Sequence, residues 1–551
     1  WPAGLEATRL TLGENKTNVP WDIVRAKLII LWGKNSAETN IHQMPFIEGA
    51  LQNGAELVVI DPRRTESAER ASLFVQPRPG TDGALALAIA HLLVKNDWID
   101  HSFISKNVYG FDRFREHLTR YDPAQAADVT GIPLQNISRL AELIGTRQPV
   151  TINAGFGMQR YSNSGQTIRA ILSLLAITGN IGKPGAGWIF ADLQTQIFDA
   201  VKDPFAFYPP SKTDGIVRQS ISTALLGKDI LEQKDPPIKM IWVERGNPVT
   251  QNPESHTVLT AFRSVDFRVV VDQFMTDTAR EADLVLPAKT MFEQTDVIGA
   301  YWHPYIQLKQ KVIEPPGGVK PESEIYYLLA GYLGFSDEEI RDYLPGPSEQ
   351  EIENFLKNKL APFPGLTLDT LKATPCLAPG VREIAFSDLV FSTPSAKIEL
   401  YSEEARDRWQ SDPLPTFKLP VEALPPSAQK TGSYPLYFMT PNTKNRIHSQ
   451  FNNLKSIRQF SEKPTLSIHP HDANPRNIND GDTVKVYNDR GAIEVEAQID
   501  YGILPGCVSV TNGWWITEGG TVNFLSGARE TDMGFGAAFH ENMVEVKRIV
   551  Q

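Results

Sequence analysis

The stretch Gly155-Phe-Gly-Met-Gln-Arg-Tyr-Ser-Asn-Ser-Gly-Gln-Thr-Ile-Arg-Ala-Ile-Leu-Ser-Leu-Leu-Ala-Ile-Thr-Gly-Asn-Ile-Gly-Lys-Pro-Gly-Ala-Gly-Trp188 decides how the rest of the chain is interpreted. Its central part places Ile168, Ile171, Leu172 and Leu175 at the spacing of one helix face, which predicts a buried helix. Glycines at 179, 182, 185 and 187 follow, and they let the backbone approach another segment closely. A buried helix with a glycine-containing loop at each end is found both in ordinary protein cores and next to ligand sites, so both interpretations remain open.

Three strand-like runs precede this stretch, and each ends in a polar loop. Residues 26–32 lead into Gly33-Lys-Asn-Ser-Ala-Glu-Thr39, residues 56–60 into Asp61-Pro-Arg-Arg-Thr65, and residues 73–77 into Arg78-Pro-Gly-Thr-Asp82. Helices are expected over 44–53 and 84–95, so strand, loop and helix repeat as in a parallel α/β sheet. Ligands of such sheets bind outside the carboxyl ends of the strands. The three loops are therefore a candidate nucleotide site, although each loop alone is also ordinary turn chemistry.

A second unit repeats this arrangement. Strands are expected over 238–243, 267–271 and 282–287, and they end at Glu244-Arg-Gly-Asn-Pro248, at Asp272 and before Phe292-Glu-Gln-Thr-Asp296. Two similar halves predict a ligand with two nucleotides or two copies of one nucleotide. No Gly-x-Gly-x-x-Gly pattern follows the first strand, so ordinary NAD binding is not supported.

The remaining segments differ in proline content and in the regularity of their hydrophobic pattern. Residues 189–236 are expected to be irregular. Residues 340–432 are rich in proline, with a candidate hairpin at 389–401 and a linker around 413–426. From residue 434 onward, short strands alternate with tight turns, which indicates a compact β-barrel of about 120 residues. We therefore predict α/β domains at 1–187 and 188–345, a connecting segment at 346–432 and a barrel domain at 433–551.

Composition narrows the class of protein. The 551 residues carry a net charge of −11, which argues against a nucleic-acid partner because no basic surplus is present to neutralise phosphates. The sequence contains no run of 18 apolar residues, so no membrane-spanning helix is predicted. The two cysteines, Cys376 and Cys507, form no metal-binding cluster. The chain opens with Trp1-Pro-Ala-Gly4, which reads as mid-protein sequence, so we expect a fragment or a processed product.

Together these segments resemble the molybdopterin oxidoreductase family, the dimethyl sulfoxide reductase class. Motifs that match in the family's order cover essentially the whole chain. They include Trp32–Thr39, Ile60–Thr65, Arg78–Asp82, Gly155–Gly187, Gly246-Asn-Pro248, Ala282-Asp-Leu-Val-Leu-Pro287, Phe391–Glu399, Thr440–Asn453 and Gly520–Leu525.

The resemblance implies two related Rossmann-like parallel-sheet domains followed by a double-psi-type β-barrel. It also implies a bis(molybdopterin guanine dinucleotide) cofactor that carries molybdenum or tungsten. The positions that match the family's cofactor-binding motifs are Trp32, Gly33, Asn35, Thr39, Asp61, Pro62, Arg63, Arg64, Gly80, Thr81, Asp82, Gly155 and Gln159 in the first unit, Asn247, Asp272, Gln294 and Glu324 in the second, and Thr440, Asn442, Arg446, His448, Ser449, Trp515, Asn523 and His540 in the barrel. His448 is the candidate catalytic residue, since it could position a substrate oxygen or donate a proton; pterin hydrogen bonding or simple loop packing is the alternative.

The resemblance also concerns parts and partners outside this chain. In the family, the segment that precedes the equivalent of Trp1 carries an iron–sulfur centre and the residue that ligates the metal. We therefore name no metal ligand here and expect this fragment alone to be inactive. A small-molecule substrate and an iron–sulfur electron-transfer subunit are the implied partners. The location is bacterial cytoplasm or periplasm, undecided between the two.

Three functions remain open on the sequence. The first is an S- or N-oxide reductase or another anaerobic respiratory reductase, which the segment Thr443-Lys-Asn-Arg-Ile-His-Ser449 favours. Formate, nitrate, thiosulfate or polysulfide chemistry and acetylene hydration also belong to this class. The second is a cofactor-less structural relative within an electron-transfer complex, which the retained Asp61, Asp82 and Asn247 disfavour. The third is an NAD(P) dehydrogenase, against which the missing glycine motif and the terminal barrel count.

Overall fold

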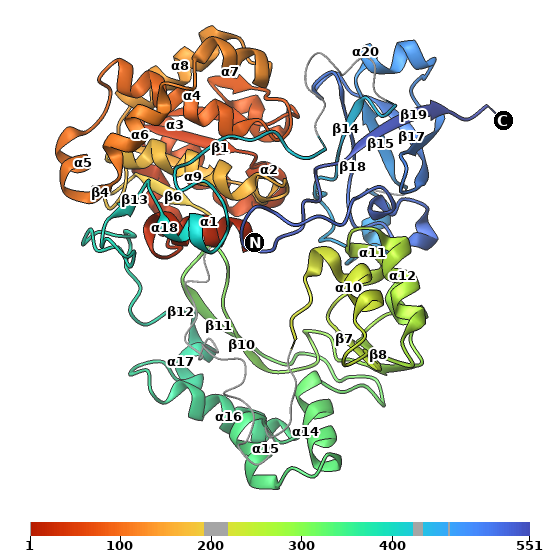
Figure 1. Cartoon of the computed structure of the whole chain (residues 1–551). Coiled ribbons are helices and arrows are strands. Elements are labelled where there is room, and N and C mark those ends of the chain that lie inside the picture. Colours follow the sequence, from red (N-terminus) through yellow and green to blue (C-terminus); the bar gives the residue numbers. More distant parts are fainter. Residues whose placement is uncertain (1, 192–218, 423–432, 461–462, 551) are drawn as a thin grey trace.

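The first unit is built on a five-stranded parallel sheet in the order β3-β2-β1-β5-β6 (Figure 1). The computed structural model describes residues 2–191, 219–422, 433–460 and 463–550. Successive side chains of β1 point into two separate cores, Leu28, Ile30 and Trp32 into one and Ile29 and Leu31 into the other. Helices therefore cover both faces of the sheet, which is why its strands are continuously apolar. The strands are β1 Leu28–Trp32, β2 Glu56–Ile60, β3 Leu73–Val75, β5 Val150–Ala154 and β6 Gly187–Ile189.

The predicted central helix is α9 (Ser164–Ile177), and all of its 14 residues are buried. It is enclosed because α1 and α4 pack along it on the sheet. The turn that follows brings backbone against backbone: Gly185 has a φ of +73°, and a Cβ there would lie 2.6 Å from the carbonyl of Arg25. The helices of this unit are α1 Pro2–Leu12, α2 Ser36–Thr39, α3 Met44–Gln52, α4 Asp82–Lys95, α5 His101–Asn107, α6 Phe111–Leu118, α7 Pro123–Thr130, α8 Leu134–Thr146 and α9.

The second unit contains the smaller parallel sheet β7-β8-β9, formed by Met240–Glu244, Phe267–Asp272 and Leu284–Pro287. Residues 192–218 of the segment expected to be irregular lie outside the described residues. The expectation is wrong for the end of that segment, because α10 (Leu226–Glu232) forms there and packs Ile230 against Ala261 and Val265. The other helices are α11 Pro248–Gln251, α12 Ser255–Ser264 and α13 Asp277–Arg280.

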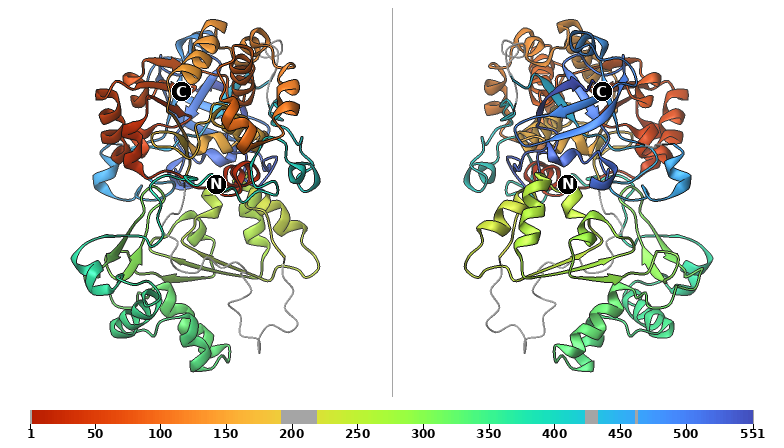
Figure 2. Two further views of the ribbon diagram at one scale, coloured as in Figure 1. Left: turned by 90° about the vertical axis from the view of Figure 1, so that its left-hand side faces the viewer. Right: turned by 90° about the vertical axis from the view of Figure 1, so that its right-hand side faces the viewer.

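A helical lobe of the second unit projects at the bottom of both views in Figure 2, and connecting structure is predicted only for its part from residue 346 onward. The prediction of poor regularity is wrong here, because Leu356, Leu360 and Leu371 form a small core with Val297 and Ile306. The lobe consists of the strands β10 Asp296–Ile298, β11 Tyr305–Lys309 and β12 Cys376–Leu377, and the helices α14 Glu322–Tyr332, α15 Asp337–Tyr343, α16 Glu349–Leu360 and α17 Leu368–Ala373.

The chain then returns to the first unit. The predicted hairpin at 389–401 is wrong, since β13 (Ile398–Glu399) pairs in parallel with the distant β4 (Val108–Tyr109). The short helix α18 (Glu403–Asp407) follows. Arg169 of α9 holds this returning segment: it is fully buried and donates hydrogen bonds to the carbonyl oxygens of Leu400 and Pro413.

The third unit is a closed barrel with strand order β14-β18-β15-β17-β16-β19. Strands β16 and β17 alternate buried and more exposed residues, while β14 and β18 are buried throughout, and the buried side chains fill the interior. The fold class predicted from the sequence, two parallel-sheet units followed by a barrel, is therefore confirmed, while the domain boundaries stay a prediction. The strands are β14 Leu436–Met439, β15 Thr465–Ile468, β16 Thr483–Tyr487, β17 Ala492–Ile499, β18 Cys507–Val510 and β19 Met543–Arg548, with the short helices α19 Lys455–Arg458 and α20 Pro470–Ala473 between them.

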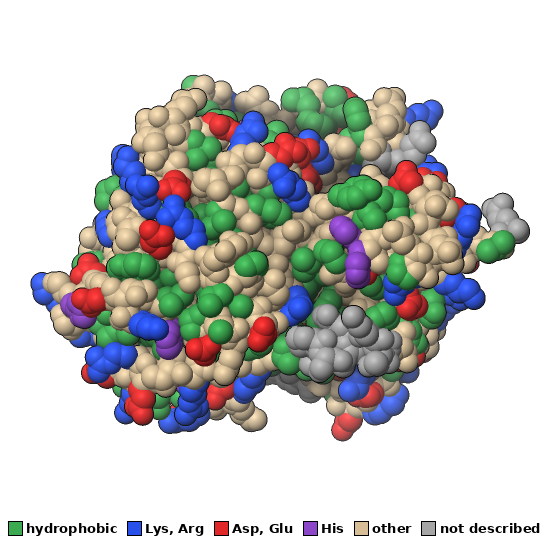
Figure 3. Space-filling model, turned by 90° about the horizontal axis from the view of Figure 1, so that it is seen from above, with side chains coloured by type: hydrophobic (Ala, Val, Ile, Leu, Met, Phe, Trp, Pro, Cys, Tyr) green, Lys and Arg blue, Asp and Glu red, His purple; other side chains and the backbone are tan. Residues whose placement is uncertain are grey.

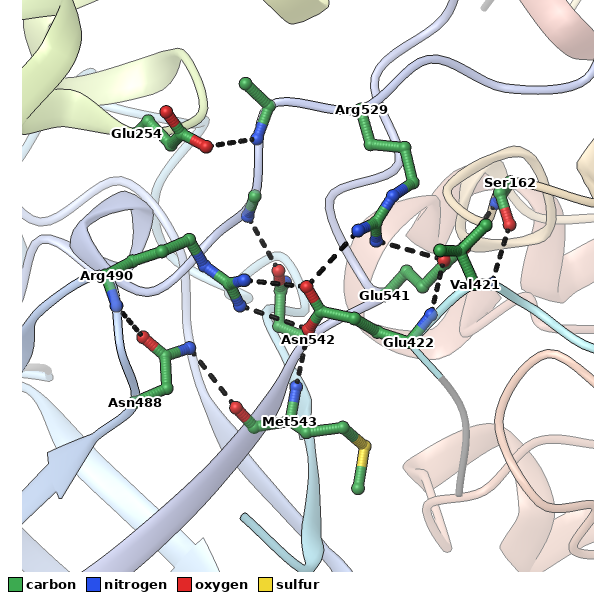
Figure 4. A network of polar contacts seen from close by, with 12 residues as sticks. Ser162, Glu254, Val421, Glu422, Asn488, Arg490, Arg529, Glu541, Asn542 and Met543 are labelled. Carbon is green, nitrogen blue, oxygen red and sulfur yellow. Dashed lines mark hydrogen bonds and ion pairs between the residues drawn. The ribbon is translucent and has the colours of Figure 1, made fainter. Parts of the chain in front are cut away.

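A charged network fastens the barrel to the first unit (Figure 4). Glu422, which precedes the barrel in the chain, receives hydrogen bonds from the two terminal guanidinium nitrogens of Arg490 at 2.6 and 3.1 Å. Glu541, only 2% exposed, accepts hydrogen bonds from the backbone amides of Ser162 and Glu422 and pairs with Arg529 at 3.0 Å. Three segments far apart in sequence thus meet on one pair of carboxylates.

The surface offers no single charged face in the view from above, where acidic and basic side chains intermingle (Figure 3). Within the described ranges, no helix combines the length and the hydropathy needed to cross a bilayer.

Candidate functional site

A cavity of about 880 Å³ lies where the carboxyl ends of the first sheet meet the barrel. We call it the central cavity. Its volume is within the range of cofactor and ligand sites. Loops after β1, β2 and β5 form one wall, the barrel loop 440–448 forms another, and the loop between β10 and β11 reaches in from the second unit. The wall includes Gly33, Lys34, Asn35, Glu38, Thr39, Ile41, His42, Asp61, Pro62, Arg63, Asp82, Gly155, Phe156, Arg160, Tyr301, Trp302, Thr440, Asn442, Lys444, Arg446, Ile447, His448, Asn512 and His540.

The strand-end loops are fixed by contacts behind this wall. The buried Trp32 indole donates a hydrogen bond of 2.8 Å to Asp82 Oδ1, and Asp61 Oδ1 accepts one from the backbone amide of Arg63. The ends of β1 and β5 touch so closely that a Cβ on Gly155 would lie 1.8 Å from the carbonyl oxygen of Gly33. The loops therefore form a rigid platform for a ligand.

Positive charge is concentrated inside the central cavity. Lys34 makes no hydrogen bond or ion pair with any other residue that the structure describes, and burial lowers its pKa to about 8. Burial likewise lowers the pKa of Arg160 and of Arg446 to about 10. Cations that lack carboxylate partners in a protein interior are stabilised by an anionic ligand, and a diphosphate supplies such a charge.

Two carboxylates face the same space. Burial raises the pKa of Asp61 to about 6, an effect that Arg63 opposes and Asp82 adds to. Burial raises the pKa of Asp82 to about 6 as well, against the hydrogen bond from Trp32. Carboxylates in such positions can accept hydrogen bonds from the N–H groups of a guanine edge or from ribose hydroxyls.

The barrel loop covers the platform. Arg446 stacks 3.6 Å above the Trp514 ring and donates to Asn452, while its Nε is buried with no hydrogen-bond partner. His448 has a φ of +49°, and Gly513 packs so tightly beneath it that a Cβ there would lie 1.8 Å from the His448 carbonyl oxygen. Burial and the charge of Arg160 lower the pKa of His448. The loop thus holds a neutral imidazole in a strained position on the cavity wall.

His540 and Arg160 join the two walls. The backbone amide of His540 donates to the carbonyl oxygen of Arg160 at 3.0 Å, and the His540 Nε2 lies 3.3 Å from the carbonyl oxygen of Thr440. Burial, with the nearby charge of Arg160, lowers the pKa of His540 to about 3, so its imidazole is neutral at physiological pH.

A second polar cluster, which we call the second seam, lies between the second unit and the barrel. Asn247 at the end of β7 accepts hydrogen bonds from Thr278, and its Nδ2 is buried without a partner. The Thr250 carbonyl oxygen accepts a hydrogen bond from the Asn523 side chain at 2.8 Å. Asp277 accepts one from the backbone amide of Ile516. The orphaned amide of Asn247 is a donor available to a ligand.

The structure divides the residues predicted from sequence between these places. Those in the wall of the central cavity are Gly33, Asn35, Thr39, Asp61, Pro62, Arg63, Asp82, Gly155, Thr440, Asn442, Arg446, His448 and His540. Trp32, Gly80, Thr81, Gln159 and Ser449 are buried outside that wall, and Trp515 donates to the Ser449 carbonyl oxygen.

The others lie farther away. Arg64 is exposed, with its guanidinium 5.9 Å from the Phe74 ring centroid. Asn247 and Asn523 belong to the second seam. Asp272 receives hydrogen bonds from the amides of the two residues that follow it, Glu324 pairs with Lys320, and Gln294 is half-buried.

Sequence reasoning did not single out several wall residues. Lys34 and Arg160 stand inside motifs that it quoted, so their position next to matched residues was the available signal. Tyr301 and Trp302 had no such signal, because they reach the cavity only through the path of the β10–β11 loop.

Comparison with known proteins gives two family models. Residues 6–332 match the model described as "Molybdopterin oxidoreductase", and residues 436–543 match "Molydopterin dinucleotide binding domain". The chain is 35% identical to the probable oxidoreductase YoaE of Bacillus subtilis, over 99% of this chain and 78% of that protein. It is 29% identical to the dimethyl sulfoxide reductase DmsA of Escherichia coli, over 97% of this chain and 73% of DmsA. Acetylene hydratase from Pelobacter acetylenicus has the same fold, with a TM-score of 0.82 at 22% identity over 99% of this chain and 81% of that chain.

Proposed function

The chain belongs to the molybdopterin oxidoreductase family, and from this premise we propose that it is the cofactor-binding part of a molybdenum or tungsten enzyme that reduces S-oxides or N-oxides in anaerobic respiration. It is a molybdopterin-dependent oxidoreductase that takes a molybdopterin dinucleotide. The observation that carries the proposal is the central cavity itself, in which the barrel loop with Arg446 and His448 faces the strand-end platform.

Two dinucleotides are proposed, one at each meeting of an α/β unit with the barrel. The first would lie on the loops of Asp61 and Asp82, with its diphosphate near Lys34, Arg160 and Arg446. The second would lie at the second seam, against the free amide of Asn247. The residues fit the group because the central cavity supplies unpaired cations and both places supply unpaired buried donors, which a guanine dinucleotide can satisfy.

When bound, the cofactor supplies a metal centre that exchanges two electrons. The proposed net reaction converts an S-oxide, two electrons and two protons into a sulfide and water, with the electrons delivered by an iron–sulfur partner subunit. The chain binds and orients the substrate, excludes bulk water and holds hydrogen-bond donors at the substrate oxygen. An iron–sulfur cluster and either a cytoplasmic or a periplasmic location are part of this proposal.

His448 is the residue that we propose for contact with the substrate oxygen. Its lowered pKa makes it a neutral hydrogen-bond donor rather than a proton donor near pH 7. We expect His448→Ala to lower kcat/KM about 100-fold. His448→Gln, which keeps an N–H donor, should lose less, and wild-type kcat/KM should not follow an imidazole titration between pH 7 and 8. Steady-state rates with a sulfoxide and a reduced dye test this; equal losses in both variants would assign His448 to loop packing instead.

The alternative is a cofactor-less relative that serves as a subunit of an electron-transfer complex. Against it stands the set of unpaired polar groups in the central cavity, since a protein without a ligand there would leave them unsatisfied.

Metal and nucleotide content decide between the two. The full-length gene product, purified without oxygen, should contain molybdenum or tungsten and about two guanine nucleotides per metal after acid release. A folded protein that contains neither would overturn the proposal and favour the cofactor-less relative.

A further inference from the structure

Several large apolar side chains of the central cavity wall are exposed. Ile41, Tyr301 and Ile447 are each more than half exposed, and Phe156 is 36% exposed, yet all of them line the cavity together with Trp302. We call these five residues the apolar rim. Exposed apolar side chains are common singly, but several that gather around one cavity indicate an apolar ligand.

The rim is assembled from separate elements. Ile41 begins the short 3₁₀ helix Ile41–Gln43, Phe156 begins the 3₁₀ helix Phe156–Gln159, and Ile447 stands on the barrel loop. Tyr301 and Trp302 belong to the β10–β11 loop, which comes from the second unit. The rim therefore combines residues of the first unit, the second unit and the barrel.

Aromatic contacts hold the β10–β11 loop in this position. The Trp302 ring meets Phe46 of α3 edge-on at a centroid distance of 6.1 Å, and Tyr305 lies 6.0 Å from the Trp21 ring. Only the first of these two contacts involves a residue of the cavity wall, since Trp21 and Tyr305 are outside it. Trp302 is therefore a fixed part of the rim.

The charged side chains near the rim do not suit a small anion. Lys444, the barrel-loop lysine, is engaged by Glu66 at 2.6 Å, and Glu38 also lines the cavity. Lys34, Arg160 and Arg446 are the cations that the proposed cofactor diphosphate would neutralise. His42, next to Ile41, and Arg63 also line the cavity, and Arg63 interacts with the Asp61 carboxylate.

We infer that Trp302, with the rest of the apolar rim, selects neutral S- or N-oxides that carry an aromatic or bulky apolar group over dimethyl sulfoxide and small anions. This inference rests on the proposed function. The oxide oxygen would face His448 while the apolar group displaces water from the rim, and removal of that water favours the larger substrate. Loss of one aromatic wall should change the preference by about 10-fold, the scale of hydrophobic discrimination in enzyme pockets.

The test compares Trp302→Ala, Trp302→Phe and Tyr332→Ala in the cofactor-loaded full-length enzyme. The ratio of kcat/KM for methyl phenyl sulfoxide to that for dimethyl sulfoxide should fall about 10-fold in Trp302→Ala and stay near the wild-type value in Trp302→Phe. Tyr332→Ala is the matched control, because it removes an aromatic ring of α14 that is 90% exposed and lies outside the cavity wall. Its ratio should equal that of the wild type.

Calorimetric binding of methyl phenyl sulfoxide to the oxidised enzyme, with no electron donor, separates this inference from the proposed function. The wild type should bind it about 10-fold more tightly than Trp302→Ala. Equal affinities in these two proteins would overturn the inference. That result is expected if the bound cofactor covers the rim. Tight, Trp302-dependent binding without any reduction would uphold the rim and refute the reductase.

Discussion

Gly155→Ala is expected to be among the most damaging single substitutions in the chain. The new methyl group would lie 1.8 Å from the Gly33 carbonyl oxygen and 2.6 Å from the carbonyl carbon. Neither strand end can withdraw, since β1 and β5 pair along their whole length in the centre of the first sheet. We expect a loss of at least about 4 kcal/mol of stability, because a clash between two backbones has no side-chain rotation to relieve it.

Thermal unfolding measures this effect. A fall of about 10 °C in Tm corresponds to such a loss, and guanine nucleotide content should fall with it because the platform lies at the same strand ends. Gly157→Ala is the control, because its Cβ would meet nothing nearer than His540 at 3.8 Å. It should unfold within about 2 °C of the wild type. If Gly155→Ala does likewise, the strand ends are not as close as described.

Glu541→Ala should be nearly as costly, for an electrostatic reason. The carboxylate is buried and accepts hydrogen bonds from the amides of Ser162 and Glu422 at 2.5 and 2.9 Å and from Arg529. Its removal leaves two amides without their acceptor and Arg529 with only Glu422, 3.4 Å away. Breaking a buried ion pair in this way typically costs about 3–5 kcal/mol.

Two further variants isolate the cause. Glu541→Gln keeps the shape and one acceptor oxygen and should lose roughly half as much. Asp407→Ala, which removes an exposed partner of Arg406, should change stability by less than about 0.5 kcal/mol. Unfolding in urea, followed by barrel and α/β fluorescence probes, would show whether the barrel detaches first. A loss in Glu541→Ala no larger than in Asp407→Ala would contradict the role assigned to the network.

Much of the first unit is predictable because its signals are local. The run at 56–60 matches β2, and the spacing of Ile168, Ile171 and Leu175 predicts the buried helix α9. Continuous apolar runs between polar loops are typical of strands in a parallel sheet that helices cover on both faces. The hydrophobic pattern alone therefore predicts this topology.

The helical lobe could have been predicted from a signal that the sequence contains. Ser336 with Glu339, and Ser348 with Glu351, form capping boxes at the start of α15 and α16. The Ser-x-x-Glu pattern is a known helix start. The high proline content of 340–432 obscured it, because prolines between short helices give the impression of a linker.

Residues of the candidate site are predictable only where a motif contains both a polar side chain and the end of the strand that positions it. Asp61 and Asp82 follow strands and therefore meet at one edge of the sheet. Tyr301 and Trp302 depend instead on how a hairpin from the second unit crosses to the first, and β13 depends on pairing with a strand nearly 300 residues earlier. Such long-range contacts leave no periodicity in the sequence.

The contacts of residues 540 and 541 also bear on when the two walls of the central cavity come together. A chain that is synthesised from its N-terminus makes the strand-end loops long before it makes the residues that close the opposite wall. His540 meets Arg160, and Glu541 meets Ser162, only after the ribosome has finished nearly all of the described chain. Until then the platform lacks its contacts with residues 540 and 541. Because both contacts need residues near the end of the described chain, the two walls of the central cavity are joined late in synthesis.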